Sequence, residues 1–210
     1  YMVKSGLVDR PDVSHYRLAA HLGLAFLIIG SIFWIIFSLV KKDNVKLDHH
    51  PKTFKFLCLF IVLISVQIVY GAFVAGLDAG LGYNTFPKMG SHWIAQGAFV
   101  GDSLMNIIME NNAMVQFIHR VLGWIIFIFA IGLLFSRSKI TNFVQRRSLL
   151  LVVLMVFLQF TLGVTTLVLM VPISVAVLHQ LGACALLIIS LNALYNFYPK
   201  KSGKWKGKIG

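Results

Sequence analysis

Five long apolar runs constrain this chain more than any other feature. Each has 18 or more residues, enough for a helix rising about 1.5 Å per residue to cross roughly 30 Å of hydrocarbon. The predicted helices are His15–Val40, Phe54–Ala75, Ala113–Phe135, Leu149–Val171 and Ile173–Phe197. The sequence therefore predicts an all-α fold, a polytopic membrane bundle of five transmembrane helices.

Composition supports the same conclusion. Only 12% of the residues are charged and 58% are hydrophobic, whereas a soluble domain has roughly 25% charged residues. These values exclude an ordinary water-soluble domain.

The positive charges indicate an orientation. Fourteen of the 19 Lys and Arg residues fall in the first loop, the third loop and the tail. They are Lys41, Lys42, Lys46, Lys52 and Lys55, then Arg137, Lys139, Arg146 and Arg147, then Lys200, Lys201, Lys204, Lys206 and Lys208. By the positive-inside rule these segments face the cytoplasm or matrix, and the long loop Gly76–Asn112 faces outward. The net charge of +12 then reflects topology and attraction to anionic lipid, and no nucleic-acid motif accompanies it.

Three histidines lie inside the predicted spans at matching depth. His21, His119 and His179 each follow the outer start of a helix by six or seven residues, which is roughly 10 Å. Ionisable groups in membrane spans usually face the bundle interior and mark a site, so we expect three imidazoles in one inward-facing layer. The other four histidines are expected to be solvated, in loops or at an edge: His15, His49, His50 and His92.

A repeat relates two of these histidines. Gln67 and Gly71 have the same Q-x-x-x-G spacing as Gln159 and Gly163, and each pair precedes a helix with a histidine near its start. The chain therefore contains two copies of one helical hairpin, which pseudo-symmetry would pack with His119 and His179 facing each other. Four glycines would let helices or a flat cofactor approach closely: Gly71, Gly123, Gly163 and Gly182. For any single glutamine or glycine, ordinary helix packing is the favoured interpretation.

Two facing imidazoles favour haem over zinc. Zinc sites usually need three or four ligands, and Cys58 and Cys184 resemble small core residues on different helices. A haem can be clamped between helices by one axial imidazole from each side. Arg120 would either bond a haem propionate or extend toward the outer interface. The long loop Gly76–Asn112 is expected to cap the haem edge, the alternative being a merely structural loop.

Three segments carry a family resemblance. GAFVAGLDAGLGYNTFPKM (Gly71–Met89), ENNAMVQFIHR (Glu110–Arg120) and LQFTLGVTTLVLMVPISVAVLHQ (Leu158–Gln180) resemble haem A synthase, in its mitochondrial and alphaproteobacterial branch. The resemblance extends along the chain to about Phe197. It implies an enzyme that oxidises a methyl group of haem O to a formyl group, giving haem A for cytochrome oxidase.

The resemblance also implies an architecture of eight helices in two pseudo-symmetric halves. The five predicted helices match the last five. The second half of the family binds haem b through two histidines, which match His119 and His179, and His21 matches one of the first-half pair that holds the substrate haem. We accordingly expect a C-terminal fragment, inactive by itself, because the acidic loop linked to catalysis belongs to the other half. Its predicted parts are 1–53 (last helix of the first half and a basic loop), 54–198 (haem-binding half) and 199–210 (basic tail).

The resemblance implies a multi-pass protein of the bacterial cytoplasmic or mitochondrial inner membrane. Candidate partners are membrane lipid, haem O synthase, cytochrome oxidase assembly factors and further copies of the chain; the electron donor, the oxygen source and the catalytic residue leave no readable mark. Two other classes stay open. One is a b-type membrane cytochrome that only transfers electrons, and the other is a small-solute transporter with histidines and glutamines along its path.

Overall fold

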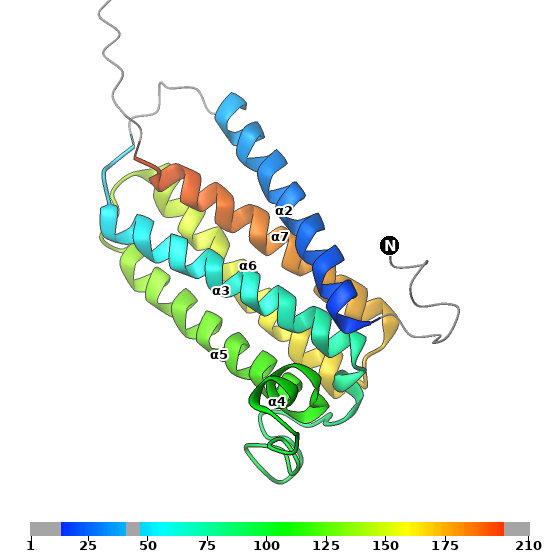
Figure 1. Cartoon of the computed structure of the whole chain (residues 1–210). Coiled ribbons are helices and arrows are strands. Elements are labelled where there is room, and N and C mark those ends of the chain that lie inside the picture. The colour runs from blue at the N-terminus through cyan, green and yellow to red at the C-terminus, as the bar shows by residue number, and fades with distance from the viewer. Residues whose placement is uncertain (1–13, 41–46, 200–210) are drawn as a thin grey trace, which may run out of the picture.

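The computed structural model describes residues 14–40 and 47–199, and the described residues form a helical bundle with a folded loop at one end (Figure 1). The helices are α2 (His15–Val40), α3 (Pro51–Gly76), η1 (Ala79–Leu81), α4 (Leu104–Glu110), α5 (Asn112–Arg137), α6 (Phe143–Val168) and α7 (Ile173–Phe197). Five of them are long and apolar enough to cross a membrane. The predicted all-α, five-span fold is confirmed, and the chain is a multi-pass membrane protein.

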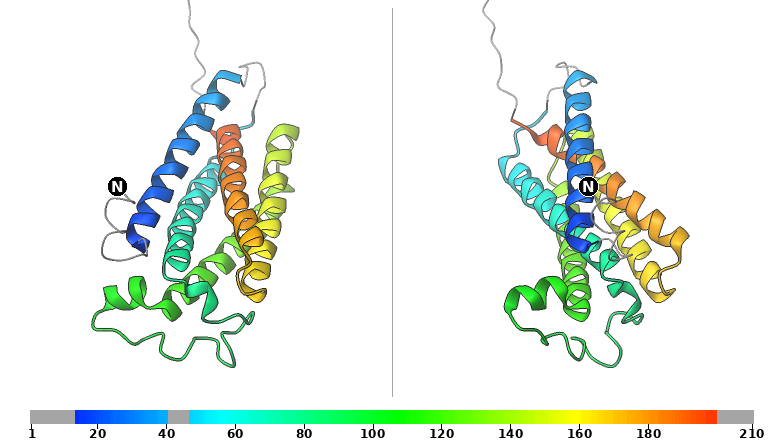
Figure 2. Two further views of the ribbon diagram at one scale, coloured as in Figure 1. Left: turned by 90° about the vertical axis from the view of Figure 1, so that its right-hand side faces the viewer. Right: turned by 45° about the vertical axis from the view of Figure 1, so that its right-hand side comes forward.

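Four of the spans form a ring. Helices α3, α5, α6 and α7 each pack against the next, and α3 also meets α7. Helix α2 lies outside this ring, against α3 and α7 (Figure 2). Helices α2, α5 and α7 all begin at the end that carries the long loop. We refer to that end as the outer end and to the opposite one as the inner end.

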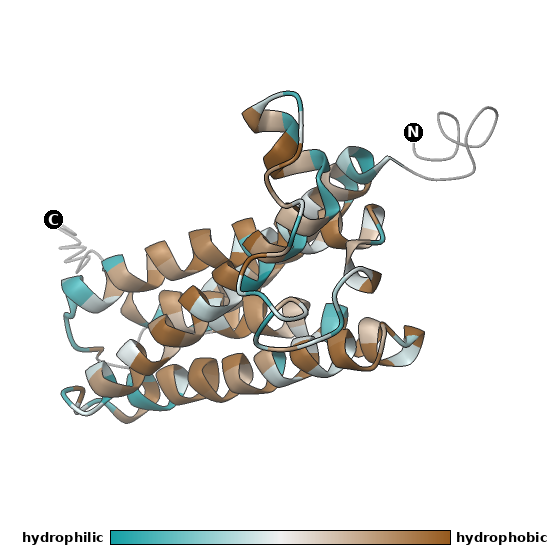
Figure 3. Ribbon diagram, turned by 90° about the horizontal axis from the view of Figure 1, so that it is seen from below, coloured by the Kyte–Doolittle hydropathy of each residue, from teal (hydrophilic) through white to brown (hydrophobic). Residues whose placement is uncertain are grey.

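Hydropathy follows this arrangement. Apolar residues dominate the middle of the long helices, and polar residues gather in the loops and at the helix ends (Figure 3). Lys139, Arg146 and Arg147 lie at or near the inner end, where α5 ends and α6 begins. The predicted basic positions Lys41, Lys42, Lys46 and Lys200 onward lie outside the described residues.

Helix α6 begins at Phe143, earlier than predicted. The side-chain oxygen of Asn142 accepts hydrogen bonds from the backbone N–H groups of Val144 (3.0 Å) and Gln145 (3.2 Å). Asparagine is a preferred N-cap residue because it satisfies donors that the first helical turn leaves unpaired. Arg146 and Arg147 therefore lie inside the helix, and they mark the edge of the apolar zone rather than the helix start.

The other end of α6 also differs from the prediction. The helix stops at Val168, and Met170 (φ 62°) and Val171 (φ 57°) adopt left-handed backbone conformations before Pro172. This region is unfavourable for a β-branched residue such as Val171. The connection from α6 to α7 is as short as predicted, because the chain reverses within this tight turn.

Large buried side chains pack closely in the inner half of the ring. Its largest fully buried side chains come from three helices: Leu57, Phe60, Leu133, Leu149 and Val152. Large apolar residues at these positions fill the space between the helices. The outer half is different, because glycines replace large residues on the facing surfaces and leave room for a cavity.

Helix α2 joins α3 at the outer end through a close contact. A Cβ at Gly76 would lie 2.7 Å from Cα of His15, so only glycine permits this approach. The His15 side chain is buried, with Nε2 3.6 Å from a carboxylate oxygen of Glu110, and the Tyr16 hydroxyl donates to the same carboxylate at 2.5 Å. The expectation of a solvated His15 is therefore wrong.

The other three loop histidines differ in their exposure to solvent. His49 and His92 are exposed as expected, whereas His50 is half-buried and its ring lies against that of Phe197, with centroids 6.0 Å apart. A helix-end histidine next to an aromatic residue buries its ring without entering the bundle.

Candidate functional site

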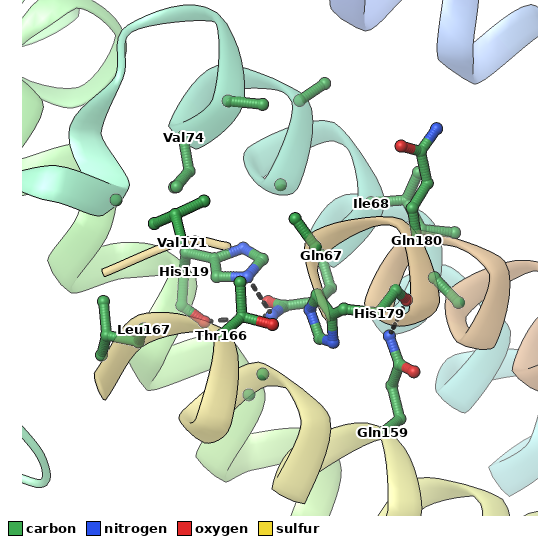
Figure 4. A pocket seen from close by; sticks show the side chains of 18 of the residues that line it. Gln67, Ile68, Val74, His119, Gln159, Thr166, Leu167, Val171, His179 and Gln180 are labelled. Carbon is green, nitrogen blue, oxygen red and sulfur yellow. Dashed lines mark hydrogen bonds between the residues drawn. The ribbon is translucent and has the colours of Figure 1, made fainter. Parts of the chain in front are cut away.

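A cavity of about 610 Å³ occupies the outer half of the bundle. All five long helices and the outer loop contribute to its wall, and most lining side chains are apolar (Figure 4). This volume falls within the range of roughly 300–1,000 Å³ that is typical of ligand sites. The polar groups that converge on it come from α3, α5, α6 and α7.

His119 and His179 project into this cavity (Figure 4). They lie at matching depth, since His119 follows the start of α5 at Asn112 by seven residues and His179 follows the start of α7 at Ile173 by six. The fold thus brings both histidines to one cavity, and that they face each other across one iron stays a prediction. Within the described part of the chain, Nδ1 of each ring is buried without a hydrogen-bond partner.

A glycine lies beside each imidazole. A Cβ at Gly71 on α3 would be 3.3 Å from Cε1 of His119, and a Cβ at Gly163 on α6 would be 2.9 Å from Cε1 of His179. Ordinary van der Waals contacts are longer than these distances. Each glycine therefore provides the space in which the ring of the neighbouring helix lies.

Each histidine is also bonded by a glutamine of the neighbouring helix, which lies one turn before the glycine on that helix. Nε2 of Gln67 donates to the backbone carbonyl of His119 at 3.1 Å, and Nε2 of Gln159 donates to that of His179 at 2.7 Å. Glycines accommodate these side chains in turn, since Cβ atoms at Gly123 and Gly182 would touch Gln67 and Gln159 respectively. The two predicted hairpins therefore share the same contacts as well as the same sequence pattern. Both glutamines join neighbouring helices, as the packing interpretation expected, and both also line the cavity.

Arg120 binds the outer loop. Its Nη1 donates to the carbonyl oxygens of Thr85 (2.8 Å) and Lys88 (3.1 Å), and its Nη2 donates to that of Tyr83 (2.7 Å). Neither expected role, a propionate contact or extension to the interface, describes these bonds. Only Nε of the guanidinium is buried and lacks a partner among the described residues.

The outer loop covers the cavity. Its residues Asp78, Gly80, Leu81 and Phe86 form part of the wall. The amide nitrogen of Asn84 donates to the carbonyl oxygen of Leu167 at the end of α6, at 2.9 Å. The loop residues Met89, Ala95 and Ala98 also form a small core with Met114 of α5. The expectation of a capping loop therefore holds for its position over the cavity.

His21 does not join the other two histidines. It is exposed on α2 and does not contribute to the cavity wall. At 3.6 residues per turn it lies on roughly the opposite side of the helix from the buried residues Ala19 and Phe26. The expectation that His21 faces the interior is wrong for the described helices. Depth alone, on which that expectation rested, does not fix the direction of a side chain.

The cavity reaches the surface between two helices. Val177 and Gln180 of α7 line it and are themselves exposed. Helix α2 meets α7 nearer the inner end, where the ring of Trp34 lies 5.3 Å from that of Tyr195. The cavity also has exposed lining residues in the outer loop, Asp78 and Leu81, so it reaches the surface on more than one side.

Two cavity residues have signals that the sequence interpretation did not use. Gln116 is buried and donates to the carbonyl oxygen of Tyr83 at 3.1 Å, so it supports the same loop as Arg120. Its spacing of four residues from Arg120 in an apolar helix is the available signal. Val171 lines the cavity from the strained turn before α7, and only the adjacent Pro172 hints at that turn.

Comparisons with known proteins identify relatives of this chain. A heme A synthase of Wolbachia sp. subsp. Brugia malayi (strain TRS) is 42% identical over 182 residues, which cover 86% of this chain and 52% of the relative. Heme A synthase of Nitrosospira multiformis is 39% identical over 194 residues (91% and 54%). Heme A synthase COX15 of Homo sapiens is 41% identical over 197 residues (89% and 48%). No solved structure matches the chain significantly.

The chain spans about half the length of the curated relatives that it matches. The family described as cytochrome oxidase assembly protein, COX15-CtaA, matches residues 1–191. The match includes the first hairpin, most of the second, the outer loop and every polar residue described in the cavity. The chain therefore belongs to the COX15-CtaA family of cytochrome oxidase assembly proteins.

Proposed function

We propose that this chain is the haem b-binding part of a haem A synthase. The single observation that carries the proposal is the cavity in which His119 and His179, from equivalent helices of two hairpins, lie together. Residues 54–198 would form the haem-binding half, and residues 1–53 would contribute the last helix of a second half. The relatives' name, heme A synthase, supports the assignment.

The residues present fit a haem. The walls are mostly apolar, and five of the buried polar atoms without a partner in the described part of the chain belong to residues that line or adjoin this space. They are Nδ1 of His119 and His179, Oε1 of Gln67 and Gln159, and Nε of Arg120. His119 and His179 would supply axial nitrogen ligands, and Arg120 Nε is a donor available to a propionate. A haem held there supplies a one-electron redox centre.

The chain's own residues give that centre a defined environment. Gln67 and Gln159 fix the backbone at each histidine, and Gly71 and Gly163 fix the space in which each ring lies. Phe86 stacks on Trp124, with ring centroids 5.8 Å apart, and closes the wall under the loop. Apolar walls and a bonded loop exclude water, which influences a redox potential as strongly as the ligands do.

The proposed substrate is haem O, which would be oxidised at a methyl group to give haem A. Its site would involve His21, whose exposed side chain lies on the far side of α2 from the cavity. An exposed imidazole within an apolar span is costly unless another element covers it. A second helical half packed on α2 would provide that cover.

Two measurements test this function. The purified chain should show the spectrum of a low-spin haem, which a transporter would lack. In cells that make haem O, the chain together with the N-terminal half of a relative should yield haem A, whereas the chain alone should bind haem b and yield none. His21→Ala should abolish the product, and Leu24→Ala, one turn away and also exposed, should not. A low-spin haem without haem A in the combined sample would indicate an electron-transfer cytochrome instead.

The proposed location is the bacterial cytoplasmic or mitochondrial inner membrane, with the inner end toward the cytoplasm or matrix. The excess of Lys and Arg at that end supports this orientation. Single cysteines at Lys88 and Lys139, both exposed, should react with an impermeant maleimide from opposite sides of the membrane. Reaction of both from the same side would contradict the orientation.

The proposed partners are lipid, haem O synthase, cytochrome oxidase assembly factors and further copies of the chain.

A further inference from the structure

The two hairpins differ in one hydrogen bond to a histidine ring. Gln67 and Gln159 make the same bond to a histidine carbonyl, but only Gln67 also reaches the ring: its Nε2 lies 3.2 Å from Nε2 of His119 (Figure 4). Among the described residues, no hydrogen bond reaches Nε2 of His179. The repeat is thus symmetric in its backbone bonds and asymmetric at the imidazoles.

The direction of the extra bond follows from its partners. An amide nitrogen only donates, so Nε2 of His119 accepts, and the ring proton is assigned to Nδ1. The orientation of the Gln67 amide is fixed by its second acceptor, the His119 carbonyl oxygen at 3.1 Å, because an amide oxygen there would be repelled. The lone pair of His119 Nε2 is therefore engaged by Gln67.

Iron would need that same lone pair. A neutral imidazole binds a metal through the lone pair of one ring nitrogen. Nδ1 of each histidine is buried and, among the described residues, has no hydrogen-bond partner, so we take Nε2 as the nitrogen that would bind iron. For His179 this nitrogen is free to bind, whereas for His119 the Gln67 amide has to withdraw first.

We propose, resting on the haem b site assigned above, that Gln67 holds the iron-binding nitrogen of His119 until His179 has taken up haem, so that the two histidines ligate in order. The exchange is balanced: one N–H···N bond breaks, one N–Fe bond forms, and the amide keeps its bond to the His119 carbonyl. Gln67 is thus a positioning residue that acts through His119. Gln159 fixes the backbone at His179 without delaying the binding of iron by that histidine.

The test follows haem uptake in time. Protein purified without haem is mixed with iron protoporphyrin IX in detergent, and absorption is recorded by stopped flow. The unmodified chain should show a high-spin species with one histidine ligand, followed by a slower low-spin species with two. Gln67→Leu should accelerate the second step about five-fold, the effect expected for losing one neutral hydrogen bond. Gln159→Leu loses the equivalent carbonyl bond but no ring contact and is the matched comparison, because it should not accelerate the second step.

A second measurement uses equilibrium affinity, which does not depend on resolving the two steps. In a His179→Ala background only His119 remains, so Gln67→Leu should tighten haem binding about five-fold. In a His119→Ala background the same change should have no effect. Gln67→Asn, which keeps the amide on a side chain too short to reach, should behave like Gln67→Leu and covers the case in which leucine disturbs folding.

The outcomes separate the two proposals. Equal second-step rates in Gln67→Leu, Gln67→Asn and the unmodified chain, with both histidine variants still altering the spectrum, would overturn the ordered uptake alone. A haem spectrum insensitive to both histidine variants would overturn the site itself. Acceleration by Gln159→Leu as large as that by Gln67→Leu would also refute the order, since the ring contact would then be irrelevant.

Discussion

His119→Ala and His179→Ala should each remove the low-spin absorption signature of the proposed haem. The two rings lie in one cavity on α5 and α7, and among the described residues no third histidine lines its wall. Loss of either axial nitrogen leaves one strong ligand, which gives a high-spin iron. We expect haem affinity to fall at least about 100-fold, because loss of groups that merely support metal ligands already costs roughly 10–100-fold.

The matched control is His92→Ala, since His92 is exposed in the outer loop. It should leave both spectrum and affinity unchanged. Retention of the low-spin spectrum in both cavity variants would show that the histidines serve helix packing instead.

Gly163→Ala should weaken haem binding roughly 10- to 100-fold, although alanine is the better helix former. The added Cβ would lie 2.9 Å from Cε1 of His179, so the ring or the helix has to shift. Overpacking of this kind costs about 1–3 kcal/mol, and here it displaces a ligand. Gly71→Ala should have a smaller effect, since its Cβ would be 3.3 Å from Cε1 of His119. Haem titration of the purified variants measures both.

Gly23→Ala controls for the change in helix propensity. A Cβ at Gly23 meets nothing within 4 Å, so this substitution should leave haem affinity unaltered and favour the helix by about 1 kcal/mol. Equal haem affinities of Gly163→Ala and Gly23→Ala would contradict the role of Gly163 as the space for the ring.

Much of the fold followed from the sequence because a membrane restricts the options. Apolar runs of this length have to be helices when every backbone polar group needs an internal partner. Depth was also predictable, since helical rise is constant, and it placed His119 and His179 in one layer. The ends of the helices were less predictable. The start of α6 at Phe143 depends on the N-cap at Asn142, a local hydrogen bond that outweighs the charges nearby.

The direction of side chains was the part that sequence did not provide. His21 and His179 have nearly the same depth, yet one is exposed and the other lines the cavity, because packing of α2 on α3 and α7 determines its rotation. His15 illustrates the same limit in reverse. Its burial depends on Gly76 and Glu110, residues distant in sequence that the fold brings to the end of α2.

The role of Arg120 also required the fold. A charged residue beside a histidine suggested a ligand contact, but its donors face the carbonyl groups of a loop some 35 residues earlier in the chain. Irregular backbone at the membrane edge needs such donors, because its carbonyl groups lack partners from regular structure. No periodicity in the sequence reports this requirement.

The clamped outer loop has a consequence for how a large flat molecule reaches the cavity. Passage from the aqueous side would break the bonds of Arg120 to Tyr83, Thr85 and Lys88, each a charge-assisted bond of about 1.5–3 kcal/mol. Passage between the outer halves of α2 and α7 breaks none of them, and Val177 and Gln180 already line that opening at the surface. A path that leaves these bonds in place and runs sideways through the bilayer, where a hydrophobic porphyrin partitions, would make the membrane itself the reservoir from which the proposed site is filled.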